Sequence, residues 1–188
     1  MAAHAGEGRG DVLKLVVTGS ECTGKTTLAR ELARWLGAPC SEEYARLYVG
    51  DKRTPLDADD VEPIARGQIA AENAALARAG AVVVLDTDLV STVVYSRHYY
   101  GACPAWVEEA ARARLGSLYL LLHPDVPWVA DGLFRDRPHL REQVHEEFLA
   151  ALAAMGARVV QVSGDWDARR TASRAAIRSA LPPPPQRQ

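Results

Sequence analysis

The chain has 188 residues, a length that suits one domain, and 48% of them are apolar, which is enough for a sizeable core. Its formal net charge of −2 offers no electrostatic case for a nucleic-acid partner. No apolar run approaches a membrane span, and residues 1–11 lack the core of a signal peptide. Cys22, Cys40 and Cys103 form no spaced metal or redox pair, so we expect a reduced, cytoplasmic setting and no membrane partner.

The most informative stretch lies near the N-terminus. Residues 12–17 are β-branched and apolar and predict a buried strand, and residues 25–36 predict an amphipathic helix. Between them runs GSECTGKT, which has the G-x-x-x-x-G-K-[ST] form of a P-loop. We therefore predict that the phosphates of ATP are bound by Gly19, Ser20, Glu21, Cys22, Thr23, Gly24, Lys25, Thr26 and Thr27.

The chemistry of this loop assigns roles to two side chains. Glycines let successive backbone N–H groups point inward, and the start of the helix adds a partial positive charge. Lys25 can then reach the β- and γ-phosphates as a catalytic residue, and the Thr26 hydroxyl can bind Mg²⁺. The alternative is a glycine-rich turn that binds nothing.

The remaining pattern alternates helices with short apolar runs. Strands are predicted at residues 38–41, 81–86, 118–122 and 158–162. Helices are predicted at residues 42–50, 57–79, 87–100, 105–115, 139–155 and 166–180, and residues 125–138 form a polar segment.

This alternation predicts a three-layer α/β fold of the P-loop NTPase type, with a five-stranded parallel sheet covered on both faces. We expect one domain over residues 1–181 and a disordered, proline-rich tail over residues 182–188. Ligands of such sheets bind beyond the carboxyl ends of the strands.

Two aspartates follow the third predicted strand. Asp86 ends the apolar run, at the position of a Walker B carboxylate, and can hold Mg²⁺ beside Thr26 or act in catalysis. Asp88 is a candidate for substrate binding. Either aspartate is also well suited to cap the helix that follows.

A carboxylate after the second strand is our candidate for the base. Glu43 would lie opposite the γ-phosphate and accept the proton of an attacking hydroxyl. Asp86 and Asp88 are the alternative candidates for the base. If Glu43 has no catalytic role, it is a solvated glutamate in the first turn of a helix.

The segment after the fourth strand predicts a movable lid. Arg135, Arg137 and Arg141 follow Gly132, which can act as a hinge. Arginines on such a loop can close over a triphosphate and neutralise charge in the transition state, so Arg135 and Arg137 are predicted catalytic residues. Exposed loop arginines are the alternative.

With these motifs in place, the chain resembles the kinase module of the NadR type, the nicotinamide riboside kinases. The matching pieces, in order, are GSECTGKTTLARELA, EEYAR, LDTDLVSTVVY, YYG and LYLLLHPDVPWVADGLFRDRP. The resemblance covers most of residues 13–162. Members often carry an aromatic residue before EYAR, where this chain has Glu42. No H-x-G-H motif occurs in this chain, so we expect another enzyme to convert the mononucleotide into the dinucleotide.

The resemblance implies Mg-ATP-dependent phosphorylation of the 5′-hydroxyl of nicotinamide riboside, on a fold like that of nucleoside and nucleotide monophosphate kinases. It places Glu43, Tyr44 and Arg46 on the acceptor side. It assigns Asp86 and Asp88 to metal and ribose, and it places Trp128 and Asp131 at the start of the lid.

Two other functions remain open on the sequence. One is a kinase of the same fold that acts on another nucleoside or a nucleotide monophosphate. The other is an ATP-binding regulator that hydrolyses slowly, although carboxylates beyond strands two and three favour a kinase. The oligomeric state is left open.

Overall fold

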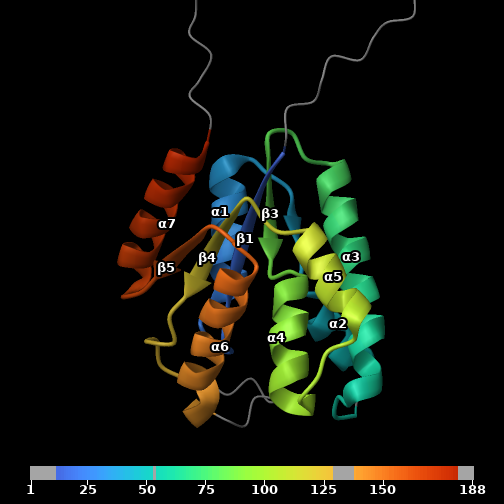
Figure 1. The fold of residues 1–188 in the computed structure, drawn as a ribbon. Helices are drawn as coiled ribbons and strands as arrows, with labels where there is room; N and C mark the ends of the chain where they lie inside the picture. Colours follow the sequence, from blue (N-terminus) through green and yellow to red (C-terminus); the bar gives the residue numbers. More distant parts are fainter. Residues whose placement is uncertain (1–11, 53, 129–137, 182–188) are drawn as a thin grey trace, which may run out of the picture.

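The computed structural model describes residues 12–52, 54–128 and 138–181. Within them, five parallel strands form one sheet in the order β2-β3-β1-β4-β5 (Figure 1). The strands are β1 (Leu13–Gly19), β2 (Cys40–Ser41), β3 (Val82–Asp86), β4 (Leu118–Leu122) and β5 (Val159–Val162). Every residue of β3 and β4 is buried, as expected for strands that are covered on both faces. The predicted sheet is confirmed.

Helices connect the strands, close to the predicted positions. They are α1 (Lys25–Leu36), α2 (Tyr44–Lys52), α3 (Val61–Ala77), α4 (Leu89–Tyr100), α5 (Ala105–Ala113), α6 (Arg141–Ala154) and α7 (Trp166–Ala180), with single 3₁₀ turns η1 (Ala58–Asp60) and η2 (Pro138–Leu140). Among the described residues, no helix combines the length and the apolar character needed to cross a membrane.

The helix predicted over residues 57–79 forms as η1 followed by an unbroken α3. Pro63 lies in the first turn of α3, where its missing N–H removes no helical hydrogen bond. Gly67 is needed for packing, because a Cβ at this position would come within 2.0 Å of the Tyr44 ring of α2. Both residues are therefore accommodated without a kink.

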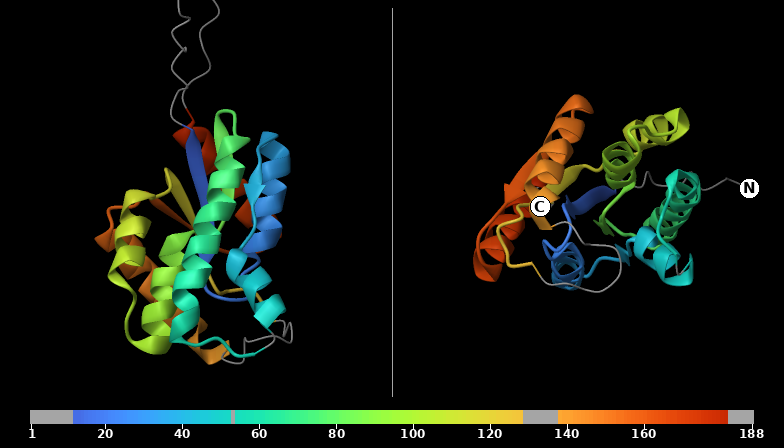
Figure 2. Two further views of the ribbon diagram at one scale, coloured as in Figure 1. Left: turned by 90° about the vertical axis from the view of Figure 1, so that its right-hand side faces the viewer. Right: turned by 90° about the horizontal axis from the view of Figure 1, so that it is seen from below.

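Two apolar cores flank the sheet. On one face, α1 and α7 pack against the strands through Leu28, Leu32 and Ile177. On the other face, α3 to α6 cover a second core that includes Val93, Ala111 and Phe148. The view from below shows α1 and α7 on one side and α4, α5 and α6 on the other (Figure 2). Helices therefore cover both faces of the sheet.

Three predicted features lie outside the described residues. They are residues 1–11, where no signal peptide is expected, the tail at residues 182–188, and most of the lid, including Asp131, Arg135 and Arg137. The predicted domain limits and the lid therefore stay predictions.

A buried pair of side chains, Asp88 and Tyr119, joins α4 to the sheet. Asp88 is the N-cap of α4, and its Oδ1 accepts a hydrogen bond from the N–H of Val90 at 3.0 Å. The Tyr119 hydroxyl donates to Asp88 Oδ2 at 2.5 Å and accepts from the N–H of Gly116 at 3.0 Å. Burial outweighs these hydrogen bonds and raises the pKa of Asp88 to about 7.

Asp88→Asn should weaken the pH dependence of the free energy of unfolding. The pKa of Asp88 is raised from 3.8 to about 7 in the folded protein, which therefore holds this proton more tightly than the unfolded chain does. The stabilisation is complete below about pH 4 and is lost as the pH rises to about 7.

The free energy of unfolding should be measured by urea denaturation at pH 5 and at pH 7.5. Between these pH values it should fall by on the order of 2 kcal/mol more in the wild type than in Asp88→Asn. The exposed Asp59→Asn variant is the control and should behave like the wild type. An equal loss in wild type and Asp88→Asn would contradict the raised pKa.

Candidate active site

The P-loop joins the end of β1 to the start of α1, as predicted. Gly19 has a φ of +139°, and a Cβ there would come within 2.7 Å of the carbonyl oxygen of Leu122. Gly24 has a φ of +84°, and a Cβ there would come within 2.3 Å of the Trp166 indole. Both positions therefore require glycine for backbone conformation and for space.

Lys25 lies over this loop. Its side chain is buried, and its Nζ donates a hydrogen bond to the carbonyl oxygen of Ser20 at 2.9 Å. The Thr23 hydroxyl donates to the same carbonyl oxygen at 2.9 Å. Within the described part of the chain, the buried hydroxyls of Thr18 and Ser20 have no hydrogen-bond partner, so the loop retains polar groups for a ligand.

Asp86 ends β3 beside the loop. The Thr26 side chain hydrogen-bonds to its carboxylate, and its buried Oδ1 has no hydrogen-bond partner among the described residues. Burial is the main cause that raises the pKa of Asp86, and the charge of Glu43 adds to the rise, whereas Thr26 and Lys25 oppose it. A cation beside this carboxylate would favour its ionised form.

The Asp86 carboxylate and the Thr26 hydroxyl fit a magnesium ion. Mg²⁺ binds oxygen atoms and usually takes only one or two carboxylates, with water and substrate phosphates as its other ligands. Across the described ranges, no group of three or more His, Cys, Asp or Glu side chains could hold a metal by itself. The donor set therefore suits a metal that is shared with a nucleotide.

Glu43 lies just beyond β2, on the other side of β3 from the P-loop. Its side chain is 14% exposed and pairs with Arg46 at 3.5 Å. Its charge contributes to the raised pKa of Asp86, so the two carboxylates lie close enough to interact. The neighbouring Glu42 points elsewhere, because it pairs with Arg30 of α1 at the surface, at 2.9 Å.

A cleft of about 640 Å³ opens beside the P-loop, between α2, α3 and α4. This volume is typical of small-molecule sites. The cleft brings together five of the residues predicted from the sequence: Glu21, Lys25, Glu43, Arg46 and Asp88. Its remaining walls include three tyrosines and an apolar patch, namely Tyr95, Tyr99, Tyr100, Val49, Leu56, Val61 and Ile64.

Tyr44 and Trp128 lie outside the lining of this cleft. The Tyr44 ring packs on Gly67, and its N–H donates to Gln68 Oε1 at 3.0 Å. The Trp128 ring faces the guanidinium of Arg141, with 5.8 Å between the guanidinium carbon and the ring centroid. These contacts favour packing roles for Tyr44 and Trp128, and helix capping favours a structural role for Asp88. The roles in substrate binding that we predicted for these three residues stay predictions.

Two buried arginines that were not among the predicted catalytic residues donate hydrogen bonds to the backbone of the P-loop. Arg141, at the start of α6, donates to the carbonyl oxygens of Val126 at 3.1 Å and Cys22 at 3.4 Å. Its position in the same arginine-rich segment as Arg135 and Arg137 could have indicated from the sequence that it lies near the P-loop.

The second is Arg169 of α7, whose side chain is completely buried. It donates to the carbonyl oxygens of Thr23 at 2.9 Å, Gly164 at 2.8 Å and His123 at 2.8 Å, and it pairs with Asp125. No sequence signal marks it, because an arginine on an amphipathic helix usually lies at the surface.

Comparison with known proteins agrees with this geometry. A family model described as "AAA domain" matches residues 14–169. The trifunctional NAD biosynthesis/regulator protein NadR of Escherichia coli (strain K12) is 32% identical over 126 residues, which are 65% of this chain and 31% of that protein. NadR of Salmonella typhimurium (strain LT2) matches to the same extent. The chain thus spans about a third of the length of these curated relatives.

Solved structures match over nearly the whole chain. A NadR protein in complex with NR has a TM-score of 0.74 at 27% identity, covering 94% of this chain and 54% of that one. A NadR protein in complex with NAD and AMP-PNP has a TM-score of 0.71 at 26% identity, covering 92% of this chain and 51% of that one. The thymidylate kinase of Ehrlichia chaffeensis, with a TM-score of 0.64 at 13% identity and coverage of 90% and 99%, shares the fold alone.

The predicted resemblance to NadR is thereby confirmed, and the sheet order and the P-loop are those of a P-loop kinase fold. Because the family model spans most of the sequence, the chain belongs to the AAA domain family of P-loop proteins.

Proposed function

We propose that this protein transfers the γ-phosphoryl group of Mg-ATP to the 5′-hydroxyl of nicotinamide riboside and so forms nicotinamide mononucleotide. The observation that carries the proposal is the acidic, tyrosine-lined cleft that opens directly beside Lys25. The similarity to NadR proteins, one of them solved in complex with NR, supports the same acceptor.

The donor half of the site consists of the P-loop, Lys25, Thr26 and Asp86. Mg-ATP supplies the phosphoryl group, and the metal stabilises negative charge on it. Lys25 adds a buried positive charge at the loop, where a low local dielectric strengthens its effect. Thr26 and Asp86 would hold the metal, and Arg135, Arg137 and Asp131 stay predicted lid residues.

The acceptor half centres on Glu43. Its carboxylate lines the cleft and is kept in place by Arg46. It would accept the proton of the attacking hydroxyl, which is a modest task, because phosphoryl transfer depends mainly on positioning and charge stabilisation.

The charge of the cleft favours a cationic nucleoside. Among the described residues, the carboxylates of Glu21, Glu43, Asp57 and Asp60 line it, against Lys25 and Arg46 in the lining and Lys52, which pairs with Asp57 and Asp60. Asp88 also lines the cleft, but its raised pKa of about 7 leaves it only partly ionised near neutral pH. Burial is the main cause that raises the pKa of Tyr100 in the cleft lining, and the charges of Asp60 and Asp57 add to the rise, whereas Lys52 opposes it.

The ring of nicotinamide riboside carries a positive charge and suits carboxylates and tyrosine faces. An acceptor that already carries a phosphate would be repelled by the same wall. The acidic wall therefore favours a nucleoside over a nucleotide monophosphate as the phosphate acceptor. The similarity to thymidylate kinase concerns the fold alone.

A panel of acceptors with Mg-ATP tests this proposal. ADP release should be rapid with nicotinamide riboside and at background level with thymidine, cytidine and nucleotide monophosphates. The product should be nicotinamide mononucleotide by mass spectrometry. ADP release that does not depend on any acceptor would contradict a kinase.

Lys25→Ala should lower kcat/KM by on the order of 100-fold or more, because the variant lacks a buried charge at the transferred group. Steady-state kinetics at varied ATP measure the effect. The exposed and remote Arg78→Ala variant is the control for a lost positive charge. Near-normal activity of Lys25→Ala would exclude the assigned role of the P-loop lysine.

Glu43→Gln should reduce kcat by roughly 10- to 100-fold while ATP binding, measured by calorimetry, persists. Glu42→Gln is the matched control, because Glu42 is adjacent but pairs with Arg30 outside the cleft. If Asp86→Asn or Asp88→Asn alone shows this effect, the base is not Glu43.

A further inference from the structure

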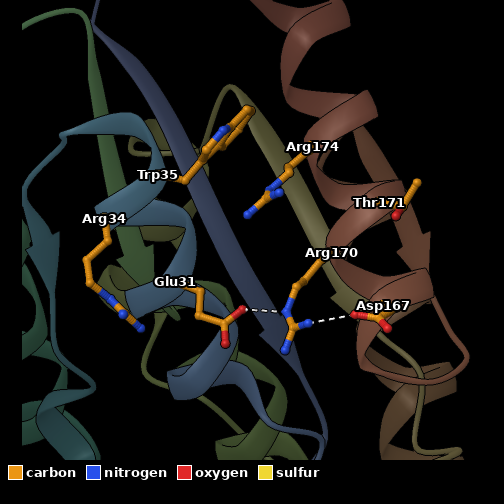
Figure 3. A pocket seen from close by; sticks show the side chains of 7 residues that line it. All are labelled: Glu31, Arg34, Trp35, Asp167, Arg170, Thr171 and Arg174. Carbon is orange, nitrogen blue, oxygen red and sulfur yellow. Dashed lines mark hydrogen bonds and ion pairs between the residues drawn. The ribbon is translucent and has the colours of Figure 1, made fainter.

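A second hollow lies between α1 and α7, in the helical layer on one face of the sheet (Figure 3). It has a volume of about 700 Å³ and shares no lining residue with the cleft beside the P-loop. Arg34 and Trp35 of α1 and Arg170 and Arg174 of α7 contribute to its walls. We call it the α1–α7 groove.

The acidic side chains of this groove are already paired. Arg170 donates from Nε to Glu31 at 2.9 Å and from Nη1 to Asp167 at 2.7 Å (Figure 3). In the described part of the chain, no carboxylate forms an ion pair with Arg34 or Arg174. The groove therefore has an excess of positive charge that its own acids do not neutralise.

Arg174 is the most informative of these arginines. Its Nε is buried and has no hydrogen-bond partner among the described residues. Its guanidinium carbon lies 5.2 Å from the centroid of the Trp35 ring, and Figure 3 shows the guanidinium directed into the space between α1 and α7. A buried N–H without an acceptor is unfavourable, and an anionic ligand would supply that acceptor.

Two guanidinium groups of α7 lie near the Trp35 ring, so positive charge gathers at this end of the groove. The guanidinium carbon of Arg178 lies 5.6 Å from the centroid of this ring, in addition to the carbon of Arg174. Arg170, Arg174 and Arg178 are four residues apart in turn, so they lie on one face of α7. Guanidinium groups in such a row present the planar N–H forks that match phosphate oxygens.

We propose that the α1–α7 groove is a second anion site, which binds a phosphate or diphosphate group through Arg174, with Arg34 and Arg178 adding charge. One wall of the groove, α1, continues from the P-loop, and the other, α7, is hydrogen-bonded to it. α1 begins at Lys25, and the neighbour of Arg170, Arg169, donates to the carbonyl oxygen of Thr23. The groove is thus separate from the donor site and lies next to the elements that shape it.

Tryptophan indole N–H resonances in ¹H–¹⁵N spectra test the proposal on the intact chain. Trp35 reports on the groove, and Trp166, which lies against Gly24, reports on the P-loop. Titration with inorganic pyrophosphate should shift the Trp35 resonance in a saturable manner. The Trp35 resonance is identified with Trp35→Phe.

Arg174→Gln should weaken the pyrophosphate affinity measured at Trp35 by at least about tenfold, and Arg78→Gln, the exposed control, should not change it. Arg174→Lys keeps the charge without the fork and should give an intermediate affinity, which also serves if Arg174→Gln does not fold. A shift of Trp166 alone, or equal affinities in wild type, Arg174→Gln and Arg174→Lys, would overturn the proposal.

A parallel titration with ADP distinguishes two sources of the phosphate. If ADP and pyrophosphate saturate the Trp35 shift at similar concentrations, the groove recognises the phosphate group itself. If ADP saturates it at concentrations at least tenfold lower, the groove recognises a nucleotide, and the base contributes to binding.

Discussion

The backbone conformation of the P-loop is the constraint on which the rest of the site depends. Gly19 and Gly24 adopt positive φ angles, and each lies against a neighbour that leaves no room for a Cβ. Arg169 then connects the loop to the ends of β4 and β5 through the carbonyl oxygens of Thr23, His123 and Gly164. Removing a fully buried charge of this kind leaves several polar groups without partners, which is strongly unfavourable.

Sheet order places the P-loop beside the carboxylates that follow the neighbouring strands. β3 lies between β2 and β1, so the ends of these three strands are neighbours at one edge. The P-loop, Asp86 and Glu43 follow those three ends, and they converge although almost seventy residues separate the first from the last. Asp86 interacts with Thr26, Lys25 and Glu43, which shows that the side chains after these three strands lie close together.

The cleft beside the P-loop and the α1–α7 groove differ in the charge of the side chains that line them. The cleft beside the P-loop has more carboxylates than cationic side chains, and the α1–α7 groove has arginines that its own carboxylates do not pair. A cationic nucleoside and a phosphate group would therefore partition to different places, even though the whole chain is nearly neutral with a net charge of −2. Local charge, not net charge, governs what each hollow can bind.

The sequence by itself determined the local structure and the position of the P-loop. Apolar runs and glycines located every strand and the P-loop, because burial on both faces and positive φ angles demand those residue types. Element ends moved by a few residues, for instance where residues 57–79 open as η1. Tertiary structure decided which polar side chains line the cleft beside the P-loop.

Asp88 and Tyr44, which were predicted to lie on the acceptor side, make capping and packing contacts, and Asp88 also lines the cleft, as do Asp57, Asp60 and Tyr100. Arg169 looks like a surface arginine in the sequence and is buried beneath the P-loop. The reason is physical: local pattern sets backbone conformation, but the direction and partners of a polar side chain depend on helices that pack from distant parts of the chain.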